Sequence, residues 1–133
     1  MSEQVAVGIV LISHSRALAE GAADVAGQVS AGAVRIVAVG GTDDGRLGTS
    51  ADALAAAVDK VSGGAGVLVI ADLGSSVLTA KAYLVEHDHP ADVQLADAPF
   101  VEGAVSAAVT ASCGASLAEV LAAAEGARGV SKL

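Results

Sequence analysis

The chain has very few of the residues on which several kinds of protein depend. Its 133 residues include no Trp, one Tyr, one Phe, two Pro and one Cys. With so few aromatic rings, it lacks the platforms on which the bases of a single-stranded nucleic acid would stack. The lone cysteine, Cys113, excludes an intrachain disulfide and fits a reducing compartment.

Basic residues are scarce as well. Seven Lys and Arg stand against 15 Asp and Glu, a formal net charge of −8. Nucleic-acid partners require clustered Lys and Arg, and an anionic membrane surface would repel the chain, so we expect neither partner. The longest apolar run, Val5–Ile12, is far shorter than the ~20 residues of a membrane-spanning helix. No basic leader precedes it, so we expect no signal peptide and a cytoplasmic location.

The residues that are abundant indicate a folded domain. Hydrophobic residues make up 53% of the chain and charged residues 17%, which excludes a disordered chain of low hydrophobicity and high charge. Domains commonly have about 100–150 residues, so we expect one domain over residues 1–133. The 16 glycines suit close packing of helices on a sheet and tight loops at strand ends.

Strand and helix patterns alternate along the chain. Val5–Ile12 is continuously apolar, which is typical of a strand buried on both faces of a parallel sheet. Ser15–Ala31 then changes to the helical period, and the residues predicted on its buried face are Leu18, Ala22, Val25, Ala26 and Val29. The same patterns predict strands over Val34–Val39, Val67–Ala71 and Val93–Ala96, and helices over Ser50–Val61 and Val77–Glu86.

The last third of the sequence is helical. Pro99 suits the start of a helix, and a capping box at Ser116-x-x-Glu119 marks the start of another. The buried face of the first of these helices is predicted to hold Val101, Ala104, Val105, Ala108 and Val109. The alternation as a whole predicts an α/β fold: an open, mostly parallel sheet of about four strands flanked by helices.

Polar residues follow each predicted strand, where an open α/β sheet collects its ligands. These segments are Ser13-His14-Ser15, Gly40-Gly41-Thr42, Asp72-Leu73-Gly74-Ser75-Ser76 and Asp97-Ala98-Pro99. His14 is the candidate nucleophile, because neutral imidazole can accept a phosphoryl group and a following helix would offer backbone N–H groups to it. If the first and third strands are neighbours, Asp72 can hold the opposite ring nitrogen and fix the tautomer. A locally bonded, purely structural His14 is the competing interpretation.

Other candidate features favour structural roles. The loop Gly40–Gly48 lacks the Lys of a phosphate-binding GxxxxGK[ST] loop, and no GxGxxG follows the first strand. His87-x-His89 has no third ligand and indicates a solvated turn, so we expect no metal site. Cys113 is predicted to be a small buried residue. Thr49-Ser50 fits either a helix cap or a phosphate contact.

Four segments together resemble a known family. They are GIVLISHSRALAEG (Gly8–Gly21), GGTDDGRLGTS (Gly40–Ser50), DLGSSVLTA (Asp72–Ala80) and DAPFVEGAVSAAV (Asp97–Val109). They resemble the DhaM family, the phosphoryl-carrier subunits of phosphoenolpyruvate-dependent dihydroxyacetone kinases, which have the mannose-type IIA fold of the sugar phosphotransferase system. The sugar-transport branch typically has Thr-His-Gly and a DLFGGSP-like loop, whereas this chain has Ser-His-Ser and Asp-Leu-Gly-Ser-Ser, which favours DhaM.

The resemblance implies a phosphocarrier without a cofactor of its own. His14 matches the phosphorylated histidine of the family, with Asp72 orienting its ring. The pocket for the phosphoryl group is expected to include Ser13, Ser15, Gly41, Thr42, Ser75 and Ser76. HPr, as a separate protein, would phosphorylate His14, and His14 would pass the group to ADP on DhaL, which serves DhaK. The family is homodimeric, and Val93–Ala96 is the candidate strand at the shared edge.

Two other functions remain open at this point. A mannose-type IIA component of sugar transport would use the same histidine. A regulator on the same fold would report its phosphorylation state to another protein without serving a kinase. A flavodoxin-like ligand-binding module is disfavoured, because the chain offers little aromatic surface for a flavin.

Overall fold

Strands and helices alternate along the folded chain as the apolar patterns predict. The computed structural model describes residues 5–42, 46 and 48–133. The strands are β1 (Gly8–Ser13), β2 (Ile36–Gly40), β3 (Val67–Ala71) and β4 (Val93–Ala96). The helices are α1 (Arg16–Val29), α2 (Ala51–Val61), α3 (Gly74–Glu86), α4 (Phe100–Ser112) and α5 (Leu117–Gly126), with a short 3-10 helix at Ala127–Gly129.

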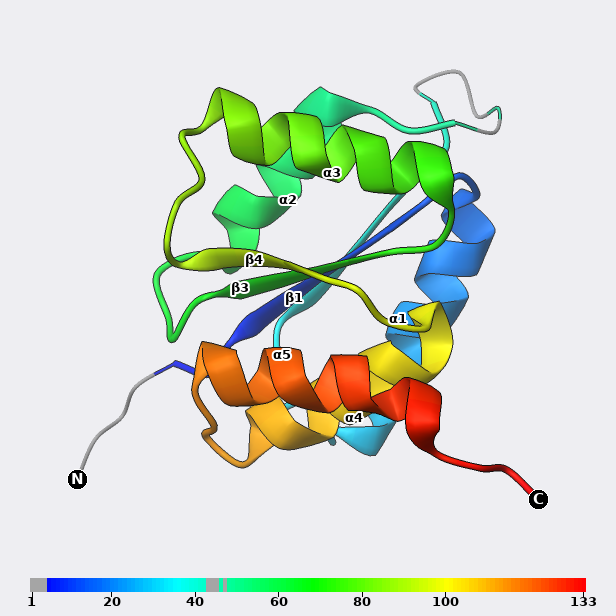
Figure 1. Ribbon diagram of the computed structural model, residues 1–133, viewed down its shortest axis with the longest axis vertical. Helices are drawn as coiled ribbons and strands as arrows, with labels where there is room; N and C mark the ends of the chain where they lie inside the picture. Colours follow the sequence, from blue (N-terminus) through cyan, green and yellow to red (C-terminus); the bar gives the residue numbers. More distant parts are fainter. Residues whose placement is uncertain (1–4, 43–45, 47) are drawn as a thin grey trace.

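The strands form one parallel sheet in the order β2-β1-β3-β4. Helices α2 and α3 cover one face, and α1, α4 and α5 cover the other (Figure 1). This arrangement confirms the predicted open parallel α/β sheet. None of the helices in the described part of the chain is long and apolar enough to cross a membrane.

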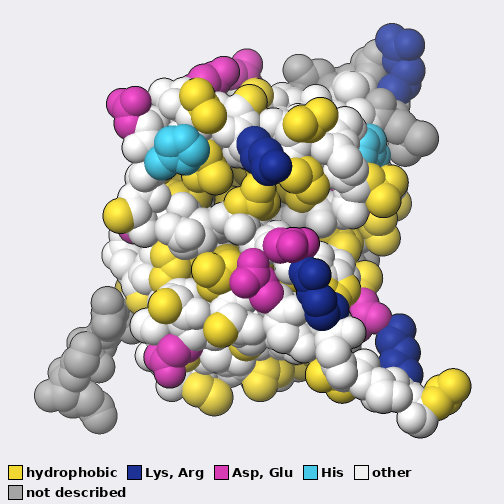
Figure 2. All heavy atoms as spheres, in the orientation of Figure 1, with side chains coloured by type: hydrophobic (Ala, Val, Ile, Leu, Met, Phe, Trp, Pro, Cys, Tyr) yellow, Lys and Arg dark blue, Asp and Glu magenta, His cyan; other side chains and the backbone are white. Residues whose placement is uncertain are grey.

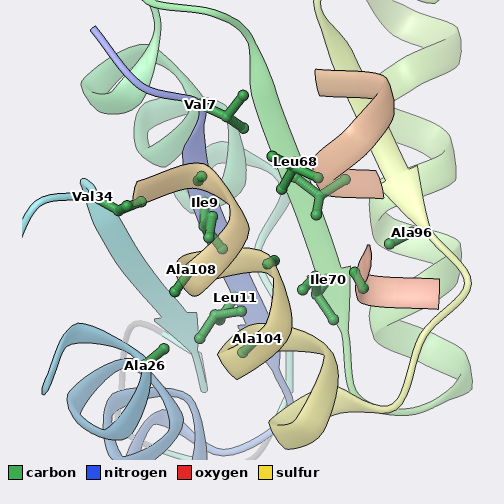
Figure 3. Close-up of a cluster of buried hydrophobic side chains, with 14 of the residues drawn as sticks. Val7, Ile9, Leu11, Ala26, Val34, Leu68, Ile70, Ala96, Ala104 and Ala108 are labelled. Atoms are coloured by element: carbon green, nitrogen blue, oxygen red, sulfur yellow. The ribbon is translucent and has the colours of Figure 1, made fainter. Parts of the chain in front are cut away.

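The two central strands are buried on both faces, as their unbroken apolar sequences predict. In β1, Ile9 and Leu11 point into one hydrophobic cluster, and Val10 and Ile12 point into the other. Figure 3 shows the first cluster, in which Leu68 and Ile70 of β3 meet Ala104 and Ala108 of α4. Burial of each Leu or Ile side chain contributes about 1.5–3 kcal/mol, so this double core holds the carboxyl ends of β1 and β3 firmly in place.

Several element boundaries differ from the prediction, and the starts of β1 and α3 differ by three residues each. β1 begins at Gly8 rather than Val5, because its neighbour β3 begins only at Val67, which is the residue paired with Gly8. The predicted helix at Val77 begins three residues earlier, at Gly74. The earlier start places Ser75 and Ser76 in the first helical turn. Residues 43–45 and 47 of the loop predicted over Gly40–Gly48 lie outside the described residues.

The predicted buried face of the first helix was right for Ala22 and Ala26 and wrong for its three larger residues. Leu18, Val25 and Val29 of α1 are between 44% and 49% exposed, whereas Ala19, Ala22 and Ala26 are buried. The reason is steric, because α1 contacts the sheet and α4 at once, and small alanines allow that close approach.

Helix α4 shows the same shift toward small residues. It lies between α1 and α5, and it buries Ala104, Ala107, Ala108 and Ala111 while Val101 and Val109 are largely exposed. The prediction was therefore right for two alanines of this face and wrong for its outer valines. Cys113, predicted to be buried, lies exposed just beyond the end of this helix.

Gly8 marks the tightest contact between the sheet and α2. A Cβ atom added at Gly8 would lie 2.6 Å from Val61 Cβ and 2.7 Å from the Val61 carbonyl oxygen. Because the oxygen belongs to the backbone at the end of α2, a side chain at Gly8 would push the helix away from the sheet.

We therefore expect Gly8→Ala to lower the free energy of unfolding by about 1–3 kcal/mol in urea denaturation. Gly21→Ala is the matched control, because Gly21 is exposed within α1 and an added Cβ meets nothing within 4 Å. That control should raise stability by about 0.5–1 kcal/mol through helix propensity. Equal effects of the two substitutions would contradict the proposed close contact.

Candidate phosphoryl-transfer site

The polar residues predicted at the strand ends meet where β1 and β3 finish. The two strands are neighbours, with Ile12 paired to Ala71, so the next residues of each chain segment lie side by side. The Asp72 backbone N–H donates to the Ile12 carbonyl at 3.1 Å. This register brings His14, two residues before α1, next to Asp72, two residues before α3.

The Asp72 carboxylate organises the residues around it. Its Oδ2 accepts from the Ser13 hydroxyl at 2.8 Å and from the His14 backbone N–H at 3.2 Å. Its Oδ1 lies 3.1 Å from His14 Nδ1 and accepts from the Leu73 backbone N–H at 2.7 Å. Only 6% of the Asp72 side chain is exposed, so one nearly buried carboxylate ties the ends of both strands together.

These hydrogen bonds keep Asp72 ionised. Burial by itself would raise its pKa, but the hydroxyls of Ser76 and Ser13 and the backbone N–H groups of Leu73 and His14 outweigh burial and lower the pKa from 3.8 to about 2. Each of these groups donates to the charged form and stabilises it. The carboxylate therefore acts purely as an acceptor toward His14 at any pH well above 2.

The accepting carboxylate determines which ring nitrogen is free. Because a carboxylate cannot donate, the Nδ1 atom of neutral His14 must carry the proton and donate it to Asp72. Nε2 then has an unprotonated lone pair, and the Ser75 hydroxyl donates to it. The Ser76 hydroxyl lies 3.2 Å from Nδ1 and also bonds Asp72. Nε2 is thus the unprotonated nitrogen of the ring.

Two helices begin beside the His14 ring. Ser15 caps α1 by accepting from the Leu18 N–H at 3.2 Å, and its own N–H donates to Ser13 Oγ at 3.0 Å. Leu73 caps α3 without a side-chain hydrogen bond. The positive ends of both helix dipoles therefore face the region of Nε2, where they favour a dianionic group.

The segment after β2 adds contacts near the site. Gly41 has a φ of +72°, and the Thr42 N–H donates to the Arg46 carbonyl at 2.8 Å. Further along, the Gly48 N–H donates to the His14 carbonyl at 2.9 Å, and Thr49 Oγ1 lies 2.7 Å from Thr79 Oγ1 of α3. The sequence marked Thr49 as a helix cap or a phosphate contact, but its bond to Thr79 and the bond of Gly48 to His14 follow from the fold.

The structure thus brings most of the predicted residues together. Ser13, Asp72, Ser75 and Ser76 surround His14, and Ser15 begins the next helix. Gly41 and Thr42 lie on the neighbouring loop, since Gly40 is paired with Ser13. Their contact with a phosphoryl group stays a prediction.

The remaining residues singled out from the sequence make contacts that stabilise the fold. The Ser50 side chain caps α2 by accepting from the Ala53 N–H at 3.2 Å. His87 ends α3 and stacks on Tyr83, with 4.1 Å between the ring centroids. Within the described ranges, no group of three His, Cys, Asp or Glu side chains is placed to hold a metal. On the face shown in Figure 2, basic side chains are scattered among acidic and apolar ones.

Comparison with known families accounts for this arrangement. A model of the EIIA-man family, described as "PTS system fructose IIA component", matches residues 8–121. The chain therefore belongs to the mannose-type IIA family of the phosphotransferase system. Within that family it is a phosphoryl donor subunit of the DhaM type, as its similarity to proteins of that name shows.

Two of these relatives differ greatly in length. A Listeria innocua protein named phosphoryl donor subunit DhaM of "PEP-dependent dihydroxyacetone kinase 2" is 35% identical over 105 residues, which cover 77% of this chain and 84% of that protein. The Escherichia coli K12 DhaM is 35% identical over 120 residues, covering 86% of this chain. This chain matches only 25% of the length of the Escherichia coli protein and of a Providencia stuartii relative.

Two solved structures have a fold similar to that of this chain. A protein of unknown function, EF1359, is 30% identical with a TM-score of 0.77, over 91% of this chain and 94% of its own. The mannose/sorbose-specific IIA subunit from Enterococcus faecalis has a TM-score of 0.64 over 96% and 95% of the two chains. At 20% identity, the second likeness bears on the fold alone.

The depressed pKa of Asp72 gives the site a defined acid dependence. Because the folded pKa is near 2, the contribution of the carboxylate to stability is complete above 3.8 and is lost as the pH falls toward 2. We expect Asp72→Asn to lower the free energy of unfolding by about 2 kcal/mol at pH 6, and by much less near pH 2.

Urea denaturation at a series of pH values measures this difference. Asp24→Asn, on the exposed side of α1, controls for the loss of one surface charge. A difference between wild type and Asp72→Asn that stays constant from pH 6 to pH 2 would show that the carboxylate is not held ionised by these contacts.

Proposed function

We propose that this protein carries a phosphoryl group on Nε2 of His14, from phospho-HPr to ADP bound on DhaL, and so supports phosphorylation of dihydroxyacetone. The observation that carries the proposal is the oriented imidazole: Asp72 holds Nδ1, and Nε2 meets the exposed Ser75 hydroxyl in the first turn of α3. An imidazole held in this way is a nucleophile with its reactive lone pair already directed.

The proposed transfer needs no group besides the chain's own residues. The lone pair of Nε2 attacks phosphorus, a new P–N bond forms, and the bond from phosphorus to the donor nitrogen of HPr breaks. Nδ1 keeps its proton, and the positive charge that develops on the ring is stabilised by the ionised Asp72 carboxylate. The second transfer reverses these roles: the P–Nε2 bond breaks as a terminal oxygen of ADP attacks.

The surroundings of Nε2 suit a group that must be accepted and then released. Ser75 is exposed and within reach of a phosphoryl oxygen, and the N-terminus of α3 adds backbone N–H groups. Ser13 and Ser76 bond Asp72, and Ser15 caps α1. Gly41 and Thr42, which follow β2, are proposed to line the same pocket. Phosphoryl transfer depends mainly on positioning and electrostatics, which this set of residues supplies.

The names of the relatives support the dihydroxyacetone pathway. The Listeria and Escherichia proteins are both called phosphoryl donor subunits of a phosphoenolpyruvate-dependent dihydroxyacetone kinase. In such a system DhaK receives the phosphoryl group only indirectly, through ATP regenerated on DhaL. The proposed carrier acts in the cytoplasm without a cofactor of its own. Its donor is phospho-HPr, and its acceptor is ADP bound on DhaL.

We expect wild-type protein incubated with phosphoenolpyruvate, enzyme I and HPr to gain one acid-labile phosphate, and His14→Ala to gain none. Intact-mass spectrometry at neutral to alkaline pH detects the added group. His87→Ala is the matched histidine control, because His87 lies at the far end of α3 and should leave phosphorylation unchanged. An unphosphorylated wild type beside a working acceptor would favour a regulatory protein on the same fold.

We also propose that the protein is a homodimer joined along β4. This strand is the edge of the sheet, pairs with β3 on one side, and has the half-buried Leu95 beside an open cleft of about 480 Å³. An exposed strand edge is a ready template for a second chain.

Sedimentation equilibrium should give a mass of two chains for wild type. We expect Leu95→Lys to increase the fraction of monomer, because a charge beside the strand edge opposes pairing. Leu78→Lys, on the exposed side of α3, is the control for an added surface charge. A monomeric wild type at micromolar concentration would overturn the dimer proposal.

A further inference from the structure

Two consecutive residues before α2, Gly48 and Thr49, form hydrogen bonds to residues of the site or of α3. The Gly48 N–H donates to the carbonyl of His14 at 2.9 Å, and one residue later Thr49 bonds Thr79 on α3 at 2.7 Å. Thr79 in turn donates to the carbonyl of Ser75 at 3.0 Å. The Ser75 hydroxyl donates to Nε2 of His14, so a chain of hydrogen bonds links Thr49 to the ring.

The direction of these bonds follows from counting protons. A threonine hydroxyl has one proton, and that of Thr79 is given to the Ser75 carbonyl. Thr79 therefore receives the bond from Thr49 on an oxygen lone pair, and Thr49 is the donor. Thr49 thus bonds Thr79, whose own hydroxyl bonds the Ser75 carbonyl one turn earlier in α3. A hydrocarbon side chain at either threonine could not form the bond between them.

We propose that Thr49 and Thr79 are positioning residues that fix the distance between the Ser75 hydroxyl and Nε2 of His14. This inference rests on the proposed function, since it concerns the same reactive nitrogen. The residues act at the first turn of α3, where Leu73 caps the helix without a side-chain hydrogen bond. Without such a cap, the Thr49–Thr79 bond supplies restraint that the N-terminus of α3 otherwise lacks.

The need for such restraint follows from what Ser75 has to do. Its hydroxyl lies directly at the lone pair that must attack phosphorus, so it has to turn aside by one rotamer and then meet the arriving phosphoryl oxygen. A helix turn held in place allows that exchange without moving the backbone. Because misplacement by about 1 Å can cost up to a hundredfold in rate, a loose first turn would slow the transfer.

The experiment uses the full chain and potassium phosphoramidate as donor, so that no partner protein affects the result. The P–N bond of phosphoramidate breaks, a bond forms between phosphorus and Nε2, and ammonia leaves. We expect Thr49→Val to phosphorylate about tenfold more slowly than wild type. Thr49→Ser, which keeps the donor, should restore the rate to within about twofold.

Two further variants separate positioning from folding. Thr79→Val removes both bonds of Thr79 and should be at least as slow as Thr49→Val. Thr110→Val is the matched control, because Thr110 is also half-buried but lies near the end of α4. In ¹⁵N NMR, the Nε2 resonance of His14 should move toward that of a ring without a hydrogen bond in Thr49→Val and Thr79→Val, but not in Thr49→Ser or Thr110→Val, while thermal unfolding stays close to wild type.

The outcomes distinguish this inference from the proposed function. If wild type and Thr49→Ser react alike while Thr49→Val is slow and has the shifted Nε2 resonance, the positioning role is supported. If wild type is phosphorylated on His14 but Thr49→Val matches it in rate and resonance, the positioning role is overturned and the carrier function stands. If wild type takes up no phosphate from phosphoramidate or HPr, the carrier function itself fails.

Discussion

The bond between Asp72 and Nδ1 of His14 is the contact on which the geometry of the site depends. It decides where the imidazole proton lies, which nitrogen can attack, and how the ring is turned. It also stabilises the positive charge that the ring acquires during transfer. Because the same carboxylate accepts from Ser13 and from two backbone N–H groups, its position is set by the ends of two paired strands rather than by its own rotamer alone.

That bond can form only because the sheet places β1 beside β3. The register puts Ile12 opposite Ala71, so that the residues after them emerge together, and two hydrophobic clusters hold the strands in this register. Small residues then let the helices approach closely. A Cβ at Gly40 would lie 2.7 Å from Arg16 Cα, so the glycine allows α1 to begin immediately against the end of β2.

Among the described residues, no basic side chain bonds the ring of His14, although the proposed cargo is an anion. The side chains that bond the His14 ring are Asp72, Ser75 and Ser76, and positive potential comes from the starts of α1 and α3. Hydroxyls and helix ends hold a phosphoryl group less tightly than a buried Arg would. A carrier benefits from such a moderate hold, because it has to release the group to the next acceptor as readily as it accepts it.

The sequence alone determined the order of strands and helices along the chain and pointed to the candidate histidine, because unbroken apolar runs and Ser-His-Ser at a strand end are local signals. It located His14, Asp72 and the two serines of α3 without showing that they touch. The tertiary structure decided three things that depend on distant residues. It buried alanines of α1 in place of Leu18 and Val25, because helix packing selects size as well as apolarity. It placed Asp72 at Nδ1 of His14 and Ser75 at Nε2. It also brought Thr49 to Thr79, a contact between residues 30 apart that no local pattern encodes.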